Sequence, residues 1–289
     1  MNETKKIRFR LGVVFALTTV YMLAEFIGGI ITNSLALLAD AGHMLGDITA
    51  LGMSFFATWI VLRPACPEKT FGYYRTEILV AMTNGMLLIG VAVFIIHEAI
   101  GRFYSPREVM APLMIIIASG GLIINLIGMV VLRSSIKHNL TVKGAFLHII
   151  GDTLGSVGAI SAGFIIYFFK FYYADLIISF IIAILITISA INLVKESTNI
   201  LLEGTPKHID INEIKDTLLS FPEIKKVHEL HVWSISLQRV ALSIHVVSDH
   251  PESQEVLCKV DKTLRERFNI HHLTIQVEPS GFPEKRCDF

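Results

Sequence analysis

Hydrophobic and polar positions divide the chain into two unlike parts. Residues 1–203 consist mostly of long apolar runs, whereas residues 204–289 alternate apolar and polar positions at the short periods of a soluble domain. The apolar runs are long enough to cross about 30 Å of hydrocarbon as helices. There are six of them, at 9–31, 35–62, 76–100, 112–132, 145–169 and 174–194. The pattern predicts a six-span transmembrane domain at 1–203 followed by a separate domain at 204–289.

The second part changes from helical to strand periodicity and back. A helix carrying Ile214 and Leu218 is expected to follow Asp210, a favourable N-cap, and to end before Pro222. Strands are predicted at 227–236, 240–247 and 272–277, with a helix at 253–268 before the last of them. The expected fold class is therefore membrane α-helical, with a small cytoplasmic α/β domain in the order αββαβ.

Basic residues predict the orientation of the spans. Lysine and arginine gather before the first run, between the second and third, between the fourth and fifth, and after the sixth, whereas the opposite flanks hold only Arg102, Arg107 and Lys170. By the positive-inside rule both termini are cytoplasmic, and the second and fifth spans run antiparallel. The first run is too long for a signal peptide and is interpreted as a span.

Composition narrows the class of protein. The chain is 53% hydrophobic and 17% charged with zero formal net charge, which is typical of a membrane protein and gives no sign of a nucleic-acid surface. Its three cysteines are far apart and form no C-x-x-C pair. Free thiols on a reducing, cytosolic side are the expected state.

One motif recurs inside two of the apolar runs. His43 and Asp47 lie in the second run and His148 and Asp152 in the fifth, each pair with the spacing H-x-x-x-D. Residues four apart share a face of a helix, and a carboxylate in hydrocarbon is costly enough to be a functional-site hypothesis. Two such helices would offer two imidazole nitrogens and two carboxylate oxygens, which suffices for a tetrahedral Zn²⁺ site.

The depths of the two motifs differ. His43 lies near the outer end of its run and His148 near the inner end of the fifth run, so helix tilt or a water-filled crevice is needed to bring them level. Asp40 shares a face with His43. It either lines the ion path or lies at a wet outer end without a special role, and both interpretations stay open.

Other polar and small residues in the runs have structural interpretations. Glu25 and Asn125 are expected to be interhelical hydrogen-bond partners, and the glycine pairs at 28–29 and 120–121 are expected to allow close helix packing.

In the second part, seven of the chain's 11 histidines fall within 204–289. That density predicts a second metal site, although spacing does not identify its ligands, and strand parity does not decide between His271 and His272.

Four stretches resemble a known family. They are SLALLADAGHMLGD, EKTFGYYRTEIL, VKGAFLHIIGDTLGSVGAI and VHELHVWSI, and they resemble zinc-exporting transporters of the cation diffusion facilitator family, in the family's order, over nearly the whole chain. The resemblance implies a homodimeric, proton-coupled antiporter in the lipid bilayer with a metallochaperone-like cytoplasmic domain. It implies a transport site formed by His43, Asp47, His148 and Asp152, and cytoplasmic zinc ligands at His231, His245, His271 and Glu278.

The chain also departs from the family pattern. Tyr74 stands where zinc members often carry a histidine, which speaks against a metal site in that loop. The link between the fourth and fifth runs is short, as in bacterial members, and this predicts the bacterial plasma (inner) membrane as the location.

The expected function is proton-coupled efflux of Zn²⁺ by alternating access, with Co²⁺ and Cd²⁺ as alternative cargo. Metal and protons compete for the same ligands, so one set of side chains can carry both. An intramembrane metalloenzyme would need an open coordination position and a general base, and the chain has no H-E-x-x-H motif. The chain is therefore predicted to be a transporter rather than an enzyme, while metal sensing by the second domain stays open as a subsidiary role.

Overall fold

The structure is a computed structural model that describes residues 3–61, 63, 66–133, 140–236 and 239–282. It contains two compact units, one formed by 1–56 with 83–194 and the other by 57–82 with 195–289. The segment 57–82, which links the second and third predicted spans, thus belongs with the C-terminal part. The domain boundary expected after residue 203 stays a prediction.

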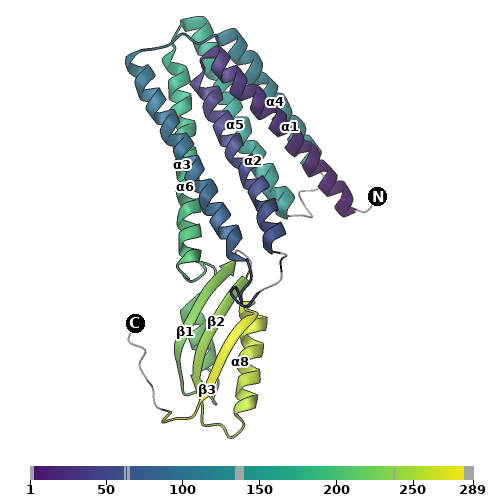
Figure 1. Ribbon diagram of the computed structural model, residues 1–289, viewed down its shortest axis with the longest axis vertical. Helices are drawn as coiled ribbons and strands as arrows, with labels where there is room; N and C mark the ends of the chain where they lie inside the picture. Colours follow the sequence, from purple (N-terminus) through teal and green to yellow (C-terminus); the bar gives the residue numbers. More distant parts are fainter. Residues whose placement is uncertain (1–2, 62, 64–65, 134–139, 237–238, 283–289) are drawn as a thin grey trace. The chain divides into compact units, whose positions relative to one another are not determined.

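Six long helices correspond to the six predicted spans (Figure 1): α1 Glu3–Thr32, α2 Leu35–Val61, α3 Arg75–Tyr104, α4 Ala111–Arg133, α5 Leu140–Phe169 and α6 Tyr173–Leu201. Over the described residues, α1, α3, α4, α5 and α6 contain stretches long and apolar enough to cross a membrane, whereas α2, which carries His43 and Asp47, does not reach that measure. The predicted membrane-helical fold class is confirmed. Two helices begin clearly earlier than predicted, α1 at Glu3 rather than at 9 and α5 at Leu140 rather than at 145.

Helix α2 packs against neighbours on two sides. Leu35 and Ala39 join a buried cluster with residues of α3 and α6, including Ala92 and Ala183. The adjoining Ala36 and Leu37 join a second cluster with Met114 of α4 and Ala159 and Ala162 of α5. Small side chains at these contacts let the helices approach closely, as is usual where lipid removes the hydrophobic driving force.

Glycines bring α1 and α4 together, as predicted. A Cβ atom added to Gly121 would lie 2.6 Å from the ring of Tyr21, and one added to Gly28 would overlap the side chain of Ile117. The hydroxyl group of Tyr21 donates a hydrogen bond to the main-chain oxygen of Ile117. Helix α1 is thereby held against α4 by shape and by one polar contact.

The beginning of α2 is fixed by a carboxylate from α6. Asp175 accepts hydrogen bonds from the Ser34 hydroxyl at 2.6 Å, the Leu35 amide at 2.7 Å and the Ala36 amide at 3.1 Å. The first amides of a helix lack partners within the helix and carry partial positive charge, so a buried carboxylate there is well compensated. This contact positions the helix that carries His43 and Asp47.

The C-terminal part has the predicted αββαβ order. Its elements are α7 Ile211–Leu219, β1 Lys226–Ser236, β2 Arg239–Val247, α8 Ser253–Phe268 and β3 His272–Glu278. Asp210 is the N-cap of α7, as expected, and accepts from the Asn212 amide at 2.8 Å. The sheet order is β1-β2-β3, with β1 antiparallel and β3 parallel to β2. Apolar residues of the two helices and the inner sheet face form one core, including Ile214, Leu218, Leu242, Ile244, Val260 and Leu264.

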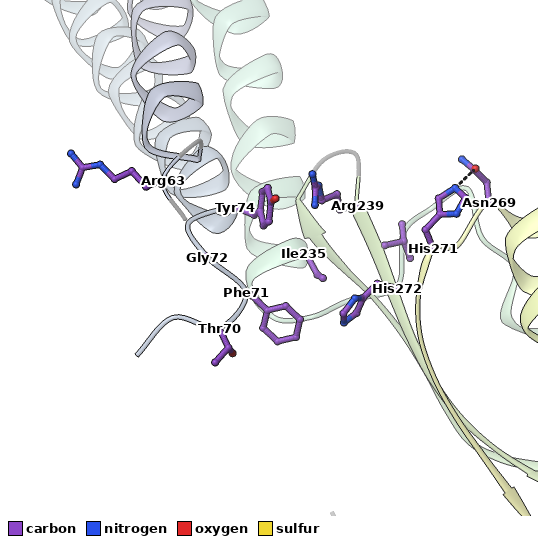
Figure 2. Close-up of a pocket in the computed structure, with 11 residues that line it drawn as sticks. Arg63, Thr70, Phe71, Gly72, Tyr74, Ile235, Arg239, Asn269, His271 and His272 are labelled. Atoms are coloured by element: carbon purple, nitrogen blue, oxygen red, sulfur yellow. Dashed lines mark hydrogen bonds between the residues drawn. The ribbon is translucent and has the colours of Figure 1, made fainter. Parts of the chain in front are cut away.

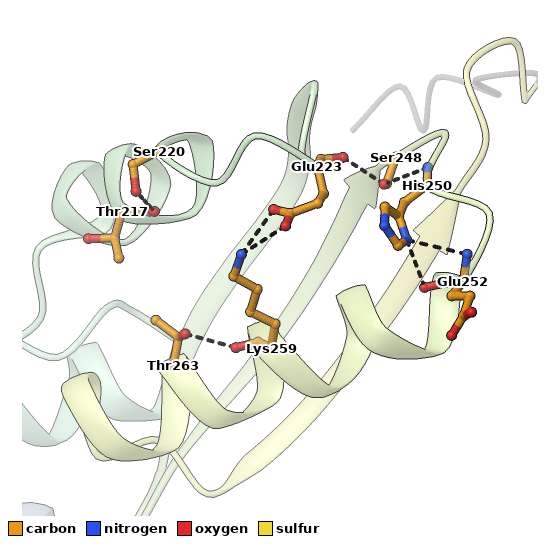
Figure 3. A network of polar contacts seen from close by, with 8 residues as sticks. All are labelled: Thr217, Ser220, Glu223, Ser248, His250, Glu252, Lys259 and Thr263. Atoms are coloured by element: carbon orange, nitrogen blue, oxygen red, sulfur yellow. Dashed lines mark hydrogen bonds and ion pairs between the residues drawn. The ribbon is translucent and has the colours of Figure 1, made fainter.

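A polar network ties α8 to the ends of the strands (Figure 3). The ammonium group of Lys259 lies 3.0 Å from each carboxylate oxygen of Glu223, and the Ser248 hydroxyl donates to the Glu223 main-chain oxygen at 2.6 Å. A hydrogen bond from its own backbone and the charge of Lys259 lower the pKa of Glu223. Ser248 also accepts from the His250 amide, so His250 belongs to this structural network.

Candidate metal centres

The two H-x-x-x-D motifs meet between α2 and α5. One ligand atom from each of His43, Asp47, His148 and Asp152 lies within 4.8 Å of all the others. Nε2 of His148 is 3.1 Å from Oδ2 of Asp47 and 3.5 Å from Oδ2 of Asp152. Nε2 of His43 is 3.9 Å from Oδ1 of Asp152, and the two imidazole rings stand nearly perpendicular at 78°. Four potential metal-ligand atoms therefore surround one point, and the closest contact among them is between His148 and Asp47.

Polar atoms at this point lack partners. Nδ1 of His43 and Oδ1 of Asp152 are buried and make no hydrogen bond to a described residue, and the buried Oδ2 of Asp47 has the two imidazoles as its neighbours. Buried polar atoms are nearly always paired, and buried charges are paired or coordinate a metal. Two imidazole nitrogens and two carboxylate oxygens fit the borderline, tetrahedral preference of Zn²⁺.

The four side chains differ in access to solvent. Asp152 is 3% exposed, whereas His43, Asp47 and His148 are 30%, 33% and 40% exposed. The site is therefore shielded from solvent at Asp152 and accessible to solvent at the other three side chains. Because α5 begins at Leu140, His148 lies about two turns inside the helix. This longer helix reduces the difference in depth that the sequence suggested.

Two further acidic residues lie buried in the same unit. Asp40 is 3% exposed, so the expectation of a wet outer position is wrong, and its carboxylate lies against α5. Glu25 is 0% exposed, and neither of its carboxylate oxygens has a hydrogen-bond partner among the described residues. The expectation that Glu25 is an interhelical hydrogen-bond partner is therefore also wrong.

A second group of potential ligands lies on the sheet of the C-terminal part. Nε2 of His228 is 3.1 Å from Oε2 of Glu278, and Nδ1 of His245 is 2.9 Å from its Oε1. Glu278 is 4% exposed, and its Oε1 also accepts from the Gln276 amide at 2.8 Å. The three side chains come from β1, β2 and β3, and their ligand atoms lie within 4.8 Å of one another.

The structure places His231 and His271 outside this group, in contrast to what the resemblance implied. Nε2 of His231 lies 3.2 Å from Oε2 of Glu229, and the side chain is 60% exposed. Figure 2 shows His271 beside a pocket of about 570 Å³, with its Nε2 3.0 Å from Oδ1 of Asn269. The neighbouring His272 instead stacks edge-on against Phe71.

A β-bulge in β1 determines how His228 and His231 face the sheet. Glu229 has a φ of 49°, and the pairing with β2 shifts between His228 and His231. Positions three apart face opposite sides of a regular strand, but the extra residue of a bulge puts both on one side. His228 then pairs directly with His245, whereas His231 pairs with Ser243 farther along.

Long apolar helices that bring together a candidate ligand set for a divalent cation, followed by a small α/β domain with a second group of potential ligands, are typical of a membrane metal carrier. The comparisons with known proteins agree. Residues 11–202 match the family described as "Cation efflux transmembrane domain", and residues 206–280 match "Cation efflux protein, cytoplasmic domain". The chain belongs to the cation diffusion facilitator family of cation efflux proteins, whose members are integral membrane transporters and not enzymes.

Curated relatives cover most of the chain. The metal cation efflux system protein CzcD of Cupriavidus metallidurans is 42% identical over 93% of this chain and 85% of its own length. The cadmium, cobalt and zinc/H(+)-K(+) antiporter of Bacillus subtilis is 45% identical over 91% and 86%. The zinc transporter ZitB of Escherichia coli is 40% identical over 93% and 87%. A solved metal-bound C-terminal domain of the CzcD transporter is 35% identical over 24% of this chain and 99% of that chain, with a TM-score of 0.23.

Proposed function

We propose that this protein exports Zn²⁺ from the cytoplasm in exchange for protons, by alternating access to a site formed by His43, Asp47, His148 and Asp152. The observation that carries the proposal is the convergence of these four side chains from α2 and α5, with their ligand atoms within 4.8 Å of one another. Co²⁺ and Cd²⁺ are alternative cargo, because both accept mixed nitrogen and oxygen ligands.

Charge balance supports transport of a divalent ion. Two ionised aspartates and two neutral histidines carry a charge of −2, and one Zn²⁺ brings the loaded site to zero. A neutral site is far cheaper to enclose in a low dielectric than a charged one. The nearly complete burial of Asp152, at 3% exposure, makes this compensation necessary for at least one of the carboxylates.

Proton coupling follows from the same charge balance. An empty, doubly negative site would be costly to reorient, whereas protons on the ligands neutralise it. Histidine titrates near neutral pH, and metal binding requires its neutral form. The ligands therefore release protons when they bind metal and take up protons when they release it.

Relatives support both the cargo and the counter-ion. The Bacillus subtilis protein is named as an antiporter of cadmium, cobalt and zinc against H(+) and K(+), and the Escherichia coli protein as a zinc transporter. Protons are the counter-ion that the ligand chemistry of this chain explains. Potassium is a second candidate that flux measurements must control for.

We further propose that the protein is a homodimer in the bacterial inner membrane with both termini in the cytoplasm. The distribution of lysine and arginine supports this orientation. The family model matched by 206–280 is named ZT_dimer, which supports dimerisation through the cytoplasmic domain.

The cytoplasmic domain is proposed to hold a second zinc ion. Contacts among His228, His245 and Glu278 support these three as ligands, since each offers a nitrogen or oxygen to one point. His231 and His271, which the resemblance implied, stay predictions to be tested beside them. Such an ion would stabilise one arrangement of the dimer by mass action.

Purified protein in proteoliposomes tests the transport proposal. Zinc flux is measured with and without an imposed pH gradient, at fixed potassium on both sides. Uphill zinc movement that follows the proton gradient supports the proposal, and zinc flux that ignores the gradient contradicts the proton exchange.

A further inference from the structure

Glu25 is a buried acid without a structural partner. It lies in α1 with 0% exposure, and both of its carboxylate oxygens lack a hydrogen-bond donor among the described residues. An ionised carboxylate with no donor and no counter-charge is very costly in a low dielectric, and such groups bind a proton instead. A neutral amide or an apolar residue could fill the same space, so packing alone does not explain an acid at position 25.

Asp40 is the principal charged neighbour of Glu25. Helices α1 and α2 pack together on both sides of these two residues, because Met22 shares a buried cluster with Met44 and a Cβ atom on Gly29 would lie 2.8 Å from the side chain of Leu38. Asp40 and, more weakly, Asp152 are the acidic groups whose charges act on Glu25, and Tyr21, one turn earlier on the same helix, is its neighbouring hydroxyl group. The single hydroxyl proton of Tyr21 is donated to the Ile117 main-chain oxygen, so the contact of Tyr21 with Glu25 does not supply a counter-charge. Helix α4 packs against α1, but its sequence from 111 to 132 contains no titratable residue.

Asp40 connects this region to α5. A Cβ atom on Gly155 would lie only 3.0 Å from Oδ1 of Asp40, so the glycine makes room for the carboxylate. The next residue, Ser156, lies one turn beyond Asp152 on the same face, is 1% exposed and has no hydrogen-bond partner among the described residues. A hydroxyl group can both donate and accept, which suits it to pass a proton.

These residues lie on one side of the metal site. Asp40 precedes His43 in α2, and Gly155 follows Asp152 in α5, each by three residues or about 4.5 Å of helix rise. Because the two helices run antiparallel in the proposed topology, both displacements point the same way. With the termini in the cytoplasm, that side is the outer one.

We propose that Glu25 and Asp40 form a proton-binding pair on the outer side of the metal site and deliver protons to it as zinc leaves. This inference rests on the proposed zinc-for-proton exchange and adds the path that the protons take. The proton held on an oxygen of Glu25 passes to the Asp40 carboxylate and then to a ligand freed of its metal. A proton from the outer side restores Glu25, so each transfer breaks one O–H bond and forms another O–H or N–H bond.

The pair solves a problem of timing. Without stored protons, release of zinc would leave two negative charges in the site until protons arrived from outside. A proton already bound at Glu25 and Asp40 can follow the departing ion at once. The negative charge left by the ion is then spread over the ligands and Glu25 until protons enter from the outer side, which costs less than two charges on the ligands alone.

The Glu25→Gln variant tests the inference, because glutamine keeps the shape but cannot exchange a proton. Zinc export driven by a pH gradient is expected to fall about tenfold more than zinc-for-zinc exchange at equal pH. Thr18→Val is the matched control. Thr18 lies two turns earlier on the same face of α1, and its hydroxyl bonds only within the helix, to the Val14 oxygen at 2.9 Å. Equal loss of both fluxes in Glu25→Gln, or no loss of either, would overturn the inference.

Infrared difference spectra provide a readout that needs no zinc. Acidification of the metal-free protein should produce the carbonyl band of a protonated, buried carboxylic acid, which Glu25→Gln removes and Thr18→Val retains. Persistence of the full band in Glu25→Gln would overturn the inference even if wild-type transport is proton-coupled. Conversely, wild-type zinc flux that ignores pH would overturn the proposed function while the band still reports on Glu25. If Glu25→Gln fails to fold, Asp40→Asn and Glu25→Asp take its place, with loss and partial retention of coupling expected.

Discussion

Nε2 of His148, on α5, lies 3.1 Å from Oδ2 of Asp47, on α2. The distance from the same nitrogen to Oδ2 of Asp152, which belongs to the same motif as His148, is 3.5 Å. The imidazole of His148 is therefore closer to the carboxylate of the other motif. The complementary contact, from His43 to Asp152, is longer at 3.9 Å. Neither helix alone can form the site, so a movement that separates α2 from α5 would divide the ligand set and release the ion.

Replacing either aspartate should abolish transport. Asp47→Ala or Asp152→Ala leaves a loaded site with one uncompensated positive charge, and zinc flux should fall at least about 100-fold. Glu108→Gln, an exposed acid outside the long helices, is a control that should transport normally. Flux is measured in proteoliposomes after insertion and helical content have been checked. Wild-type rates from either alanine variant would exclude these residues as the transport site.

The two histidines should determine metal selectivity. A double variant with His43→Asp and His148→Asp replaces borderline nitrogen ligands by hard oxygen ligands, which favour Mn²⁺ and Mg²⁺ relative to Zn²⁺. Competition between metals in vesicles should show a broader range of cargo. If the double variant keeps the wild-type order of metals, the imidazoles do not set that order.

Zinc should bind to the cytoplasmic domain through its three-strand cluster. Residues 204–289 are expected to fold alone, to dimerise and to bind zinc in isothermal titration. His228→Ala, His245→Ala and Glu278→Ala should each weaken binding at least about tenfold, because each removes a ligand. His231→Ala and His271→Ala are the matched comparisons. A larger effect from these two than from His228→Ala would favour the ligand set that the family resemblance implied.

Zinc transport should depend steeply on pH on both sides of the membrane. Higher cytoplasmic pH should strengthen zinc capture, because metal ligands must be deprotonated and fewer protons then compete with the metal. Lower outer pH should speed release. Vesicles with equal zinc on both sides and a pH difference of about one unit should show net zinc movement, driven by about 1.4 kcal/mol per proton. The absence of net movement would leave a facilitated uniporter as the mechanism.

The cytoplasmic domain should lose stability in acid. The ammonium group of Lys225 lies 2.5 Å from the carboxylate of Asp249, and the Ser280 amide donates a hydrogen bond to the same carboxylate. These two contacts lower the pKa of Asp249 to about 2. A group whose pKa is lower in the folded state stabilises the fold above its unfolded pKa of about 3.9, and this contribution disappears as the pH falls towards 2. Thermal unfolding of 204–289 should therefore show a falling midpoint in this range. Asp249→Asn should flatten that dependence, and an unchanged profile would show that the contact is too exposed to matter.

Much of the fold could be predicted from the sequence because the membrane imposes strong rules. Apolar runs of sufficient length must be helices, and the proposed transport ligands could be identified as candidates because the same spacing occurs twice at costly positions. The helix ends were less certain. Leu140 begins α5 several residues before the apolar run does, because helix formation does not require an apolar side chain at every position.

Other features depend on contacts that the sequence does not reveal. The bulge at Glu229 puts His228 opposite His245, and the sequence alone gives no sign of that bulge, whereas His231 was implied by the family resemblance and stays a prediction. The burial of Glu25 without a partner could not be distinguished from an ordinary interhelical hydrogen bond. Asp175 has the local signature of a helix start, and only the packing of α6 beside α2 shows that it serves another helix.

The Asp175 contact has a consequence for how the protein is made. All four transport ligands have been synthesised by residue 152, yet the carboxylate that holds the first amide of α2 lies 140 positions after it in the chain. During biosynthesis α2 therefore enters the membrane before its anchor exists. The metal site acquires its final geometry only when the sixth helix has left the ribosome and docked, so assembly of the site is among the last steps in the maturation of the transmembrane part.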